Sequence, residues 1–207
     1  MDITIDQIKA LREESGVGIL DCRNALEQTN GDFEKALEAL REKGFAKAEK
    51  RAEREASEGI VEVYSHGNGR IGVLVELNCE TDFVSKTDKF REFAHEIALQ
   101  VTAAGAEYVS EDDIEEDVLI AIREEALEMV KEEGKPEKIW ENIIEGKIKK
   151  FKDEKVLLNQ KYIRNDELTI QDVMNNTIAA MGEKLVIRRI ARFELGELSA
   201  VEEQEEE

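Results

Sequence analysis

Apolar residues recur every three or four positions in the first 44 residues, which is the spacing of one face of an α-helix. The pattern predicts three short helices joined by tight turns. Thr4 and Gln7 have the spacing of a capping box before the first helix, and Gly18 opens the second. Asp32 is expected to cap the third helix, and Gly44 to end it. A bundle with so small a core is more typical of a docking module than of an enzyme.

A charged stretch follows at residues 45–57, where Lys or Arg alternates with Glu and Ala. This alternation predicts a helical connector whose charged side chains face water. Its basic residues Lys47, Lys50 and Arg51 have an alternative role as contacts for an acidic partner.

Two segments that follow residue 58 are typical of β-strands, and residues 71–79 alternate with the strand period of two. Residues 60–64 and 71–79 are predicted as two strands joined by a glycine-containing hairpin loop. The second strand has one continuous apolar face, which must be covered. Residues 86–104 carry a matching helical stripe and are predicted to cover it.

Two more helices are predicted within residues 111–152, where Pro136 fits the first turn of the second, so that they form an antiparallel hairpin. Residues 169–181 are predicted as a further helix, and 185–195 as a last strand that returns to the first hairpin. The fold class is therefore α+β: a three-helix bundle, then a small antiparallel sheet covered by helices, with a protruding helical hairpin. The predicted domains are the bundle (1–44), the helical linker (45–57), the α+β core (58–198) and an acidic tail (199–207).

The net charge of −20 limits the classes of partner, since it repels phosphate backbones and anionic membranes. Neither nucleic acid nor a membrane is expected as a partner. A hydrophobic content of 41% is enough for a folded core despite 38% charged residues. No apolar run approaches the roughly 18 residues needed to cross a bilayer, and the chain starts without a leader pattern, so a cytoplasmic location is expected.

Cys22 and Cys79 are too few and too far apart for a disulfide scaffold, which also favours a reducing cytoplasm. An enzyme would need one of them as nucleophile and His66 or His95 as base. The periodicity instead places both cysteines on apolar faces, where they are expected to be buried. There is also no metal-ligand spacing and no glycine-rich nucleotide loop, so no metal, cofactor or enzymatic activity is expected.

The segment Thr81–Val84 stands between the clearest strand and the helix that covers it. A turn there should project Phe83 beyond the edge of the sheet. Taken alone, the pattern also fits an alternative in which Phe83 belongs to the core and Asp82 is a turn or cap residue.

Several motifs of this chain resemble those of the elongation factor Ts family, bacterial guanine-nucleotide exchange factors of translation. They include Gly-Val-Gly-Ile-Leu-Asp-Cys-Arg from residue 16, Cys-Glu-Thr-Asp-Phe-Val from residue 79 and Ile-Ala-Arg-Phe-Glu-Leu-Gly from residue 190. The matches extend over nearly the whole chain. For the N-terminal bundle, which resembles the ubiquitin-associated-like domain of that family, a ubiquitin-binding module is the competing interpretation. For the whole chain, the alternative is a non-catalytic adaptor or chaperone-like scaffold.

The resemblance implies a partner, elongation factor Tu, and two sets of contact residues. Thr81, Asp82, Phe83 and Val84 would disturb the Mg²⁺ site of that partner so that GDP leaves and GTP binds. The bundle would dock on the same partner through a second set of residues: Leu11, Val17, Gly18, Ile19, Leu20 and Arg23. Longer members contain a duplicated core, whereas this chain resembles the short form with one copy. A homodimer that covers the exposed sheet surface is therefore expected.

Overall fold

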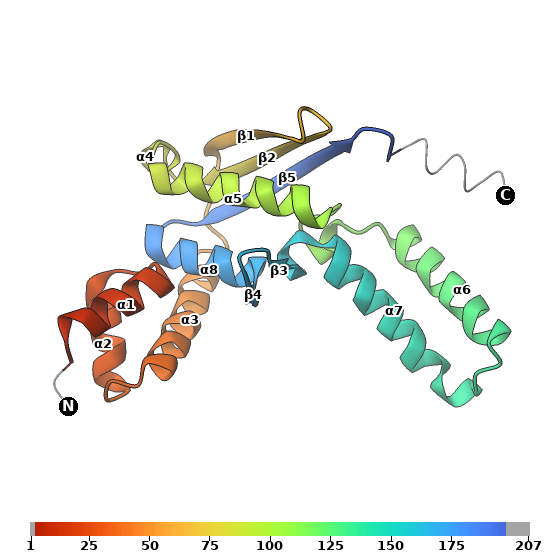
Figure 1. The fold of residues 1–207 in the computed structure, drawn as a ribbon, viewed down its shortest axis with the longest axis horizontal. Coiled ribbons are helices and arrows are strands. Elements are labelled where there is room, and N and C mark those ends of the chain that lie inside the picture. The colour runs from red at the N-terminus through yellow and green to blue at the C-terminus, as the bar shows by residue number, and fades with distance from the viewer. Residues whose placement is uncertain (1–2, 198–207) are drawn as a thin grey trace. The chain divides into compact units, whose positions relative to one another are not determined.

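The computed structural model describes residues 3–197 and has the predicted α+β class (Figure 1). Its helices are α1 (Ile5–Ser15), α2 (Ile19–Gln28), α3 (Phe33–Glu49), α4 (Asp82–Ser85), α5 (Asp88–Ala104), α6 (Glu116–Glu132), α7 (Trp140–Lys155) and α8 (Ile170–Met181). Its strands are β1 (Glu58–His66), β2 (Ile71–Cys79), β3 (Lys161–Tyr162), β4 (Asn165–Thr169) and β5 (Leu185–Glu194). Short 3-10 turns lie at Glu111–Asp113, Glu137–Ile139 and Leu157–Asn159. The predicted acidic tail, 199–207, lies outside the described residues.

The described chain divides into two compact units, each built from three segments. The first unit contains residues 3–61, 76–94 and 171–187, and the second contains residues 62–75, 95–170 and 188–197. The N-terminal bundle and the Thr81–Val84 segment therefore belong to the same unit. The predicted domain boundaries at residues 44, 57 and 198 remain a prediction.

The N-terminal bundle begins with the predicted capping box: Gln7 N donates to Thr4 Oγ1 at 3.3 Å, and Thr4 N donates to Gln7 Oε1 at 2.9 Å. Asp32 caps α3, as predicted, by accepting a hydrogen bond from Lys35 N. The three helices share one buried core of Leu11, Val17, Cys22, Ala25, Leu26, Ala36, Leu37 and Leu40. The burial expected for Cys22 is confirmed.

Gly44 does not end the third helix, contrary to the prediction. Helix α3 continues through it to Glu49, and Gly44 is buried against α8. A Cβ atom at Gly44 would lie 3.6 Å from Asn175 O and 3.7 Å from Ala179 Cβ. Gly44 therefore lies at a contact between two helices, with room for a Cβ atom, and not in a turn. The linker predicted as helical over 45–57 is helical only to Glu49, and turns and extended backbone follow.

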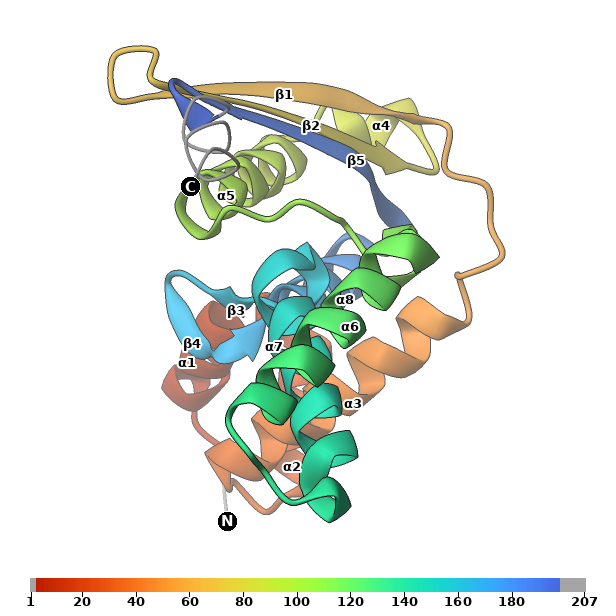
Figure 2. The ribbon, with the colours of Figure 1, turned by 90° about the vertical axis from the view of Figure 1, so that its right-hand side faces the viewer.

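The main sheet has the strand order β1-β2-β5, so the last strand returns to the first hairpin as predicted. Gly67, Asn68 and Gly69 form the hairpin loop with φ values of 60°, 57° and 86°. Figure 2 shows α5 along one face of this sheet, the position predicted for the covering helix. In the second unit, Val73 and Val75 of β2 are buried, and so are Ile97, Ala98 and Val101 of α5.

A small antiparallel pair, β3 and β4, was not predicted. Side chains of α5 hold it in the second unit: Gln100 accepts from Ile163 N at 2.9 Å, and Glu96 accepts from the Tyr162 hydroxyl at 2.8 Å. The Arg164 guanidinium also donates to Glu96 and holds the pKa of that carboxyl below its usual range. Burial, with Glu96 as neighbour, raises the pKa of Tyr162 to about 12. Glu96 and Gln100 lie far from β3 and β4 in the sequence. The local pattern of residues 161–169 therefore did not predict this strand pair.

The predicted helical hairpin consists of α6 and α7, with a core of its own made by Ala126, Ile144 and Ile148. Arg123 of α6 donates to Glu141 and Glu145 of α7. Helix α7 begins at Trp140, later than predicted, because Pro136 precedes a 3-10 turn instead of standing in the first turn of the helix. None of the helices within residues 3–197 is both long and apolar enough to cross a lipid bilayer.

Candidate functional site

The Thr81–Val84 segment leaves the end of the central strand β2 and forms the start of the one-turn helix α4. Thr81 occupies the N-cap position, but its hydroxyl does not cap the helix. It donates instead to Glu183 Oε1 at 2.6 Å, while Thr81 N donates to Glu183 Oε2 at 3.0 Å. Both contacts lie within the first unit.

Phe83 is 82% exposed, so the interpretation of this residue as a core aromatic is wrong. The expectation that the turn projects Phe83 outward is confirmed. The reason is local: Ser85 of the same helical turn is buried and Val84 is half-buried, which leaves Phe83 on the opposite side.

Asp82 is the first residue of α4, in agreement with the expected turn or cap position. Its carboxylate forms an i,i+4 ion pair with Lys86. The hydrogen bond from Lys86 lowers the pKa of Asp82, so this carboxylate is negatively charged at neutral pH. The segment therefore presents a large apolar ring next to a negative charge.

The second predicted set of contact residues lies at the start of α2 and in the turn before it. Gly18 is the N-cap of α2, and Ile19 and Leu20 are exposed, Leu20 to 70%. Arg23 is also exposed, and its Nε donates to Glu27 at 2.7 Å. These four residues, the docking set, are accessible to a partner.

Leu11 and Val17, which were predicted with this set, are buried in the core of the bundle. Their side chains are in contact with the bundle interior and are not presented at its surface. Of the six residues predicted as the second contact set, only the docking set is therefore exposed at the surface of the bundle.

The groups considered for nucleophilic chemistry have other partners. The Cys79 thiol donates to Thr81 O at 3.1 Å, and burial raises its pKa, which disfavours the reactive thiolate. His95 lies 2.9 Å from Glu62, and His66 lies 3.1 Å from the Tyr64 hydroxyl. Within the described part of the chain, no group of three or more His, Cys, Asp or Glu residues is arranged to hold a metal ion.

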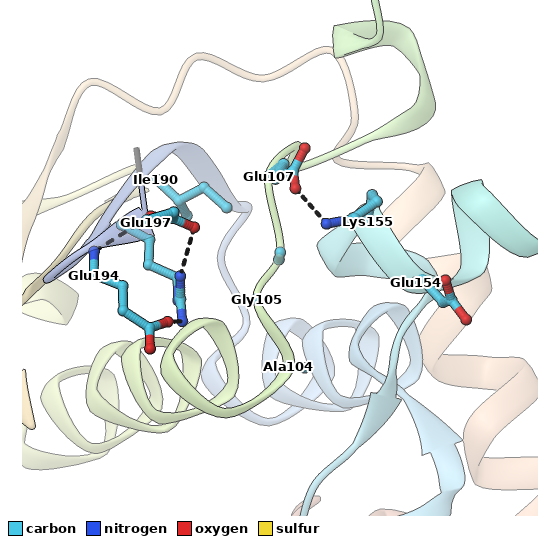
Figure 3. Close-up of a pocket in the computed structure, with 10 residues that line it drawn as sticks. Ala104, Gly105, Glu107, Glu154, Lys155, Ile190, Glu194 and Glu197 are labelled. Atoms are coloured by element: carbon cyan, nitrogen blue, oxygen red, sulfur yellow. Dashed lines mark hydrogen bonds and ion pairs between the residues drawn. The ribbon is translucent and has the colours of Figure 1, made fainter. Parts of the chain in front are cut away.

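A hollow of about 580 Å³ lies in the second unit, lined by residues 104–107, Glu154, Lys155 and part of residues 190–197 (Figure 3). Its two basic side chains are paired with carboxylates: Lys155 with Glu107, and Arg192 with Glu194 and Glu197. None of the residues predicted to contact a partner lines it.

The comparison with protein families shows which family the chain belongs to. The model of the family described as elongation factor TS matches residues 21–197. This chain belongs to the elongation factor Ts family. The family membership makes it a translation elongation factor and agrees with the motifs found around residues 16, 79 and 190.

Individual relatives support the same family over nearly the whole chain. The chain is 51% identical to elongation factor Ts of Caldanaerobacter subterraneus subsp. tengcongensis, over 94% of this chain and 98% of the relative. It is 50% identical to elongation factor Ts of Carboxydothermus hydrogenoformans, over 98% of this chain and 94% of the relative. The elongation factor Ts of Coprothermobacter proteolyticus is matched over its full length at 48% identity. These three relatives are therefore matched over nearly their whole length.

Sequence reasoning missed the residues that fix the Thr81–Val84 segment in place. Glu183 and Lys184 precede β5 and are separated from their partners Thr81 and Glu80 by 102 and 104 residues. Adjacent Glu and Lys residues are common in this highly charged chain, so nothing in the local sequence marks Glu183-Lys184 as different from the other Glu-Lys pairs. Only the pairing of β5 with β2 brings it to this position.

Proposed function

We propose that this protein is a guanine-nucleotide exchange factor that binds elongation factor Tu in its GDP form and promotes release of GDP. The observation that carries the proposal is Phe83, a large aromatic ring exposed to 82% on a turn fixed at the end of the central strand. The action consists of binding alone and makes or breaks no covalent bond, so the protein is not an enzyme. The site of action is the cytoplasm, where translation elongation takes place.

The mechanism uses the strict geometry of the partner's metal ion. A GTPase holds GDP through Mg²⁺ that bridges phosphate oxygens, and Mg²⁺ requires nearly octahedral coordination. The ring of Phe83 acts as a wedge: it inserts between side chains of the partner and shifts the helices and loops behind the metal site. Buried aromatic anchors of this kind often carry much of the energy of an interface.

The neighbours of Phe83 have supporting roles. Asp82 brings its negative charge and hydrogen-bond acceptors next to the contacts that support the ion, without ligating Mg²⁺ itself. Thr81 sets the turn through its bonds to Glu183, and Val84 packs along the side of the wedge.

Exchange follows from the reciprocity of binding free energies. A factor that lowers the affinity for nucleotide is itself bound less tightly when nucleotide is present. The nucleotide-free complex therefore forms after GDP leaves and dissociates when GTP binds. Excess GTP selects the final state by mass action.

The N-terminal bundle contributes affinity for the same partner through the docking set Gly18, Ile19, Leu20 and Arg23. Two adjacent exposed aliphatic side chains on a turn are an apolar contact surface that is costly to leave in water. Leu11 and Val17 support this turn from the interior of the bundle.

We also propose that the active form is a homodimer joined through the outer face of the main sheet. Val63, Leu74 and Phe193 are exposed apolar residues of β1, β2 and β5, all in the second unit. Leu74 alternates with the buried Val73 and Val75, so it lies on the face opposite the covering helix. A second copy would bury this apolar surface by an isologous contact.

The test is the release of fluorescent GDP from elongation factor Tu under excess unlabelled nucleotide, with and without this protein. We expect acceleration by at least about tenfold in the presence of Mg²⁺. After chelation of Mg²⁺ the factor should add little, because the contact that it disturbs is already absent. A complex that forms without any acceleration would contradict the proposal and leave a non-catalytic adaptor.

A further inference from the structure

The turn that carries Phe83 has little intrinsic stability. Helix α4 consists of only the four residues Asp82–Ser85, and a single helical turn does not persist without outside support. The usual support is a hydrogen bond from a backbone N–H of the first turn to the N-cap hydroxyl. Helix α4 lacks this bond, because Thr81 Oγ1 is bonded to Glu183 instead. The direction of Phe83 must therefore be set by contacts from outside the turn.

Thr81 provides the fixed point, because its polar atoms are all bonded. Its N and Oγ1 donate to the two oxygens of Glu183 at 3.0 and 2.6 Å. Its carbonyl oxygen accepts from the Cys79 thiol at 3.1 Å and from Ser85 N at 3.4 Å. Thr81, two residues before Phe83, is thus held from β2, from α4 and from the turn before β5.

A second carboxylate makes the reverse contact between the same two segments. Glu80 Oε1 accepts from Lys184 N at 2.6 Å, so residues 80 and 81 exchange hydrogen bonds with residues 183 and 184. The Lys184 ammonium donates to Ala52 O and Arg54 O at 2.6 and 2.8 Å. Arg54 in turn donates to Glu80 at 3.2 Å. The chain that leaves the N-terminal bundle is therefore tied into the same network.

We propose that Glu183 is a positioning residue for nucleotide exchange: together with Glu80, Arg54 and Lys184 it forms a clasp that holds the Thr81–Val84 turn in the orientation in which Phe83 enters the partner. This inference rests on the proposed exchange function and assigns to it residues outside the predicted contact sets. Glu183 does not touch the nucleotide or the partner's metal ion. It acts through Thr81.

The proposal distinguishes orientation from binding. Without the clasp, Phe83 still reaches the partner but spends less time in the productive direction. The rate of GDP release at saturating factor therefore falls, while the affinity for the partner, which depends on the docking set, changes little.

Three variants separate the contributions of the clasp. Glu183→Ala removes both bonds to Thr81. Glu183→Gln keeps them, since its carbonyl oxygen accepts from Thr81 N and its amide donates to Thr81 Oγ1. Thr81→Val removes the hydroxyl bond alone. Glu92→Ala, a change of an exposed glutamate on α5 in the same unit, is the matched control.

The experiment measures fluorescent GDP release from elongation factor Tu over a range of factor concentrations, with thermal unfolding of each variant. We expect the maximal rate to fall about tenfold for Glu183→Ala, with the half-saturating concentration changed less than about twofold. Glu183→Gln should stay within about threefold of the parent protein, Thr81→Val should fall in between, and Glu92→Ala should match the parent.

Amide hydrogen exchange of residues 81–85 in the free protein supplies a readout that does not depend on the partner. We expect Thr81 N–H to exchange about tenfold faster in Glu183→Ala and to stay protected in Glu183→Gln. A parental maximal rate in Glu183→Ala would overturn the inference while leaving the exchange function intact. A parallel loss of affinity and of melting temperature would overturn it as well, because the role would then be structural. Absence of any acceleration by the parent protein would remove the proposed function and this inference together.

Discussion

At the scale of single residues, the site consists of an exposed ring and the groups that hold it. Phe83 contributes little to the fold, because most of its surface remains in water. Its motif was recognised in the sequence and its outward projection was expected, but the local pattern also fitted a core aromatic, and the structure was needed to decide. The partners of Thr81 could not be predicted, because hydrogen bonds between residues about 100 positions apart leave no local signal.

Glu80 gives the clasp a defined pH dependence. The hydrogen bond from Lys184 N, followed by the one from Arg54, lowers its pKa from the ordinary value of 4.5. Since the folded-state pKa lies below the unfolded-state one, Glu80 stabilises the fold fully above about pH 4.5, and this contribution is lost as the pH falls through the lowered value.

We therefore predict that Glu80→Gln lowers the free energy of unfolding most at neutral pH and progressively less toward acid. Urea unfolding of both proteins between about pH 3 and 8 measures the difference. Glu92→Gln serves as the control and should show a small effect throughout. A destabilisation by Glu80→Gln that grows on acidification would contradict the assignment.

At the scale of elements, periodicity predicted those helices and strands that carry a long apolar stripe. It predicted the bundle, the β1-β2 hairpin, α5, the α6-α7 hairpin, α8 and the return of β5. It failed where tertiary contacts outweigh local preference. Gly44 is a packing residue and not a helix stop, and the short β3 and β4 depend on α5 for their place.

The packing role of Gly44 leads to a prediction about stability. A Cβ at this position would make ordinary van der Waals contacts at 3.6 and 3.7 Å, so Gly44→Ala should stabilise the protein by about 0.5–1 kcal/mol through its higher helix propensity. Gly44→Leu should destabilise it, because the added atoms have no space between α3 and α8. Urea unfolding measures both, and a destabilisation by Gly44→Ala would contradict the conclusion that a Cβ atom has room at this helix contact.

Gly59 is the contrasting case and serves as the control for that experiment. Its φ is 152°, and a Cβ would lie 2.1 Å from Leu77 O in the neighbouring strand. We expect Gly59→Ala to cost at least about 2 kcal/mol, since the backbone must shift to accommodate it.

The docking set predicts a different kinetic signature from that of Phe83. Leu20→Ala removes an exposed apolar contact on α2 and leaves the Thr81–Val84 segment intact. We expect the half-saturating concentration of the factor to rise about tenfold at an unchanged maximal rate of GDP release. Arg12→Ala, a change at an exposed residue of α1, is the control. A fall in the maximal rate with unchanged half-saturation would place Leu20 in the exchange step instead.

At the scale of the whole molecule, net charge gave only the expectation that nucleic acid and membranes are not partners, and the resemblance of motifs indicated the protein partner. The family is established by the match over residues 21–197. The proposal of a homodimer rests on a surface property, the row of exposed apolar residues on the outer face of the sheet. Sequence alternation indicated one buried face of β2 but could not show that the opposite face also carries apolar residues from β1 and β5.

The dimer is tested by Phe193→Asp, which places a charge on the face proposed as the interface, where Phe193 is now 71% exposed. Light scattering at micromolar concentration should give twice the chain mass of 23.5 kDa for the parent protein and 23.5 kDa for the variant. Leu20→Asp, which changes an exposed residue outside the sheet, should remain dimeric. A strictly monomeric parent protein would contradict the proposal.

The most direct test of the account compares two exposed phenylalanines, Phe83 on α4 and Phe45 on α3. Fluorescent GDP release from elongation factor Tu is measured at saturating concentrations of the parent protein, Phe83→Ala and Phe45→Ala, with complex formation followed in parallel. The account predicts that Phe83→Ala loses at least about 90% of the acceleration while still forming the complex, and that Phe45→Ala retains it. Equal acceleration by Phe83→Ala and the parent protein would contradict the role of Phe83 as the wedge.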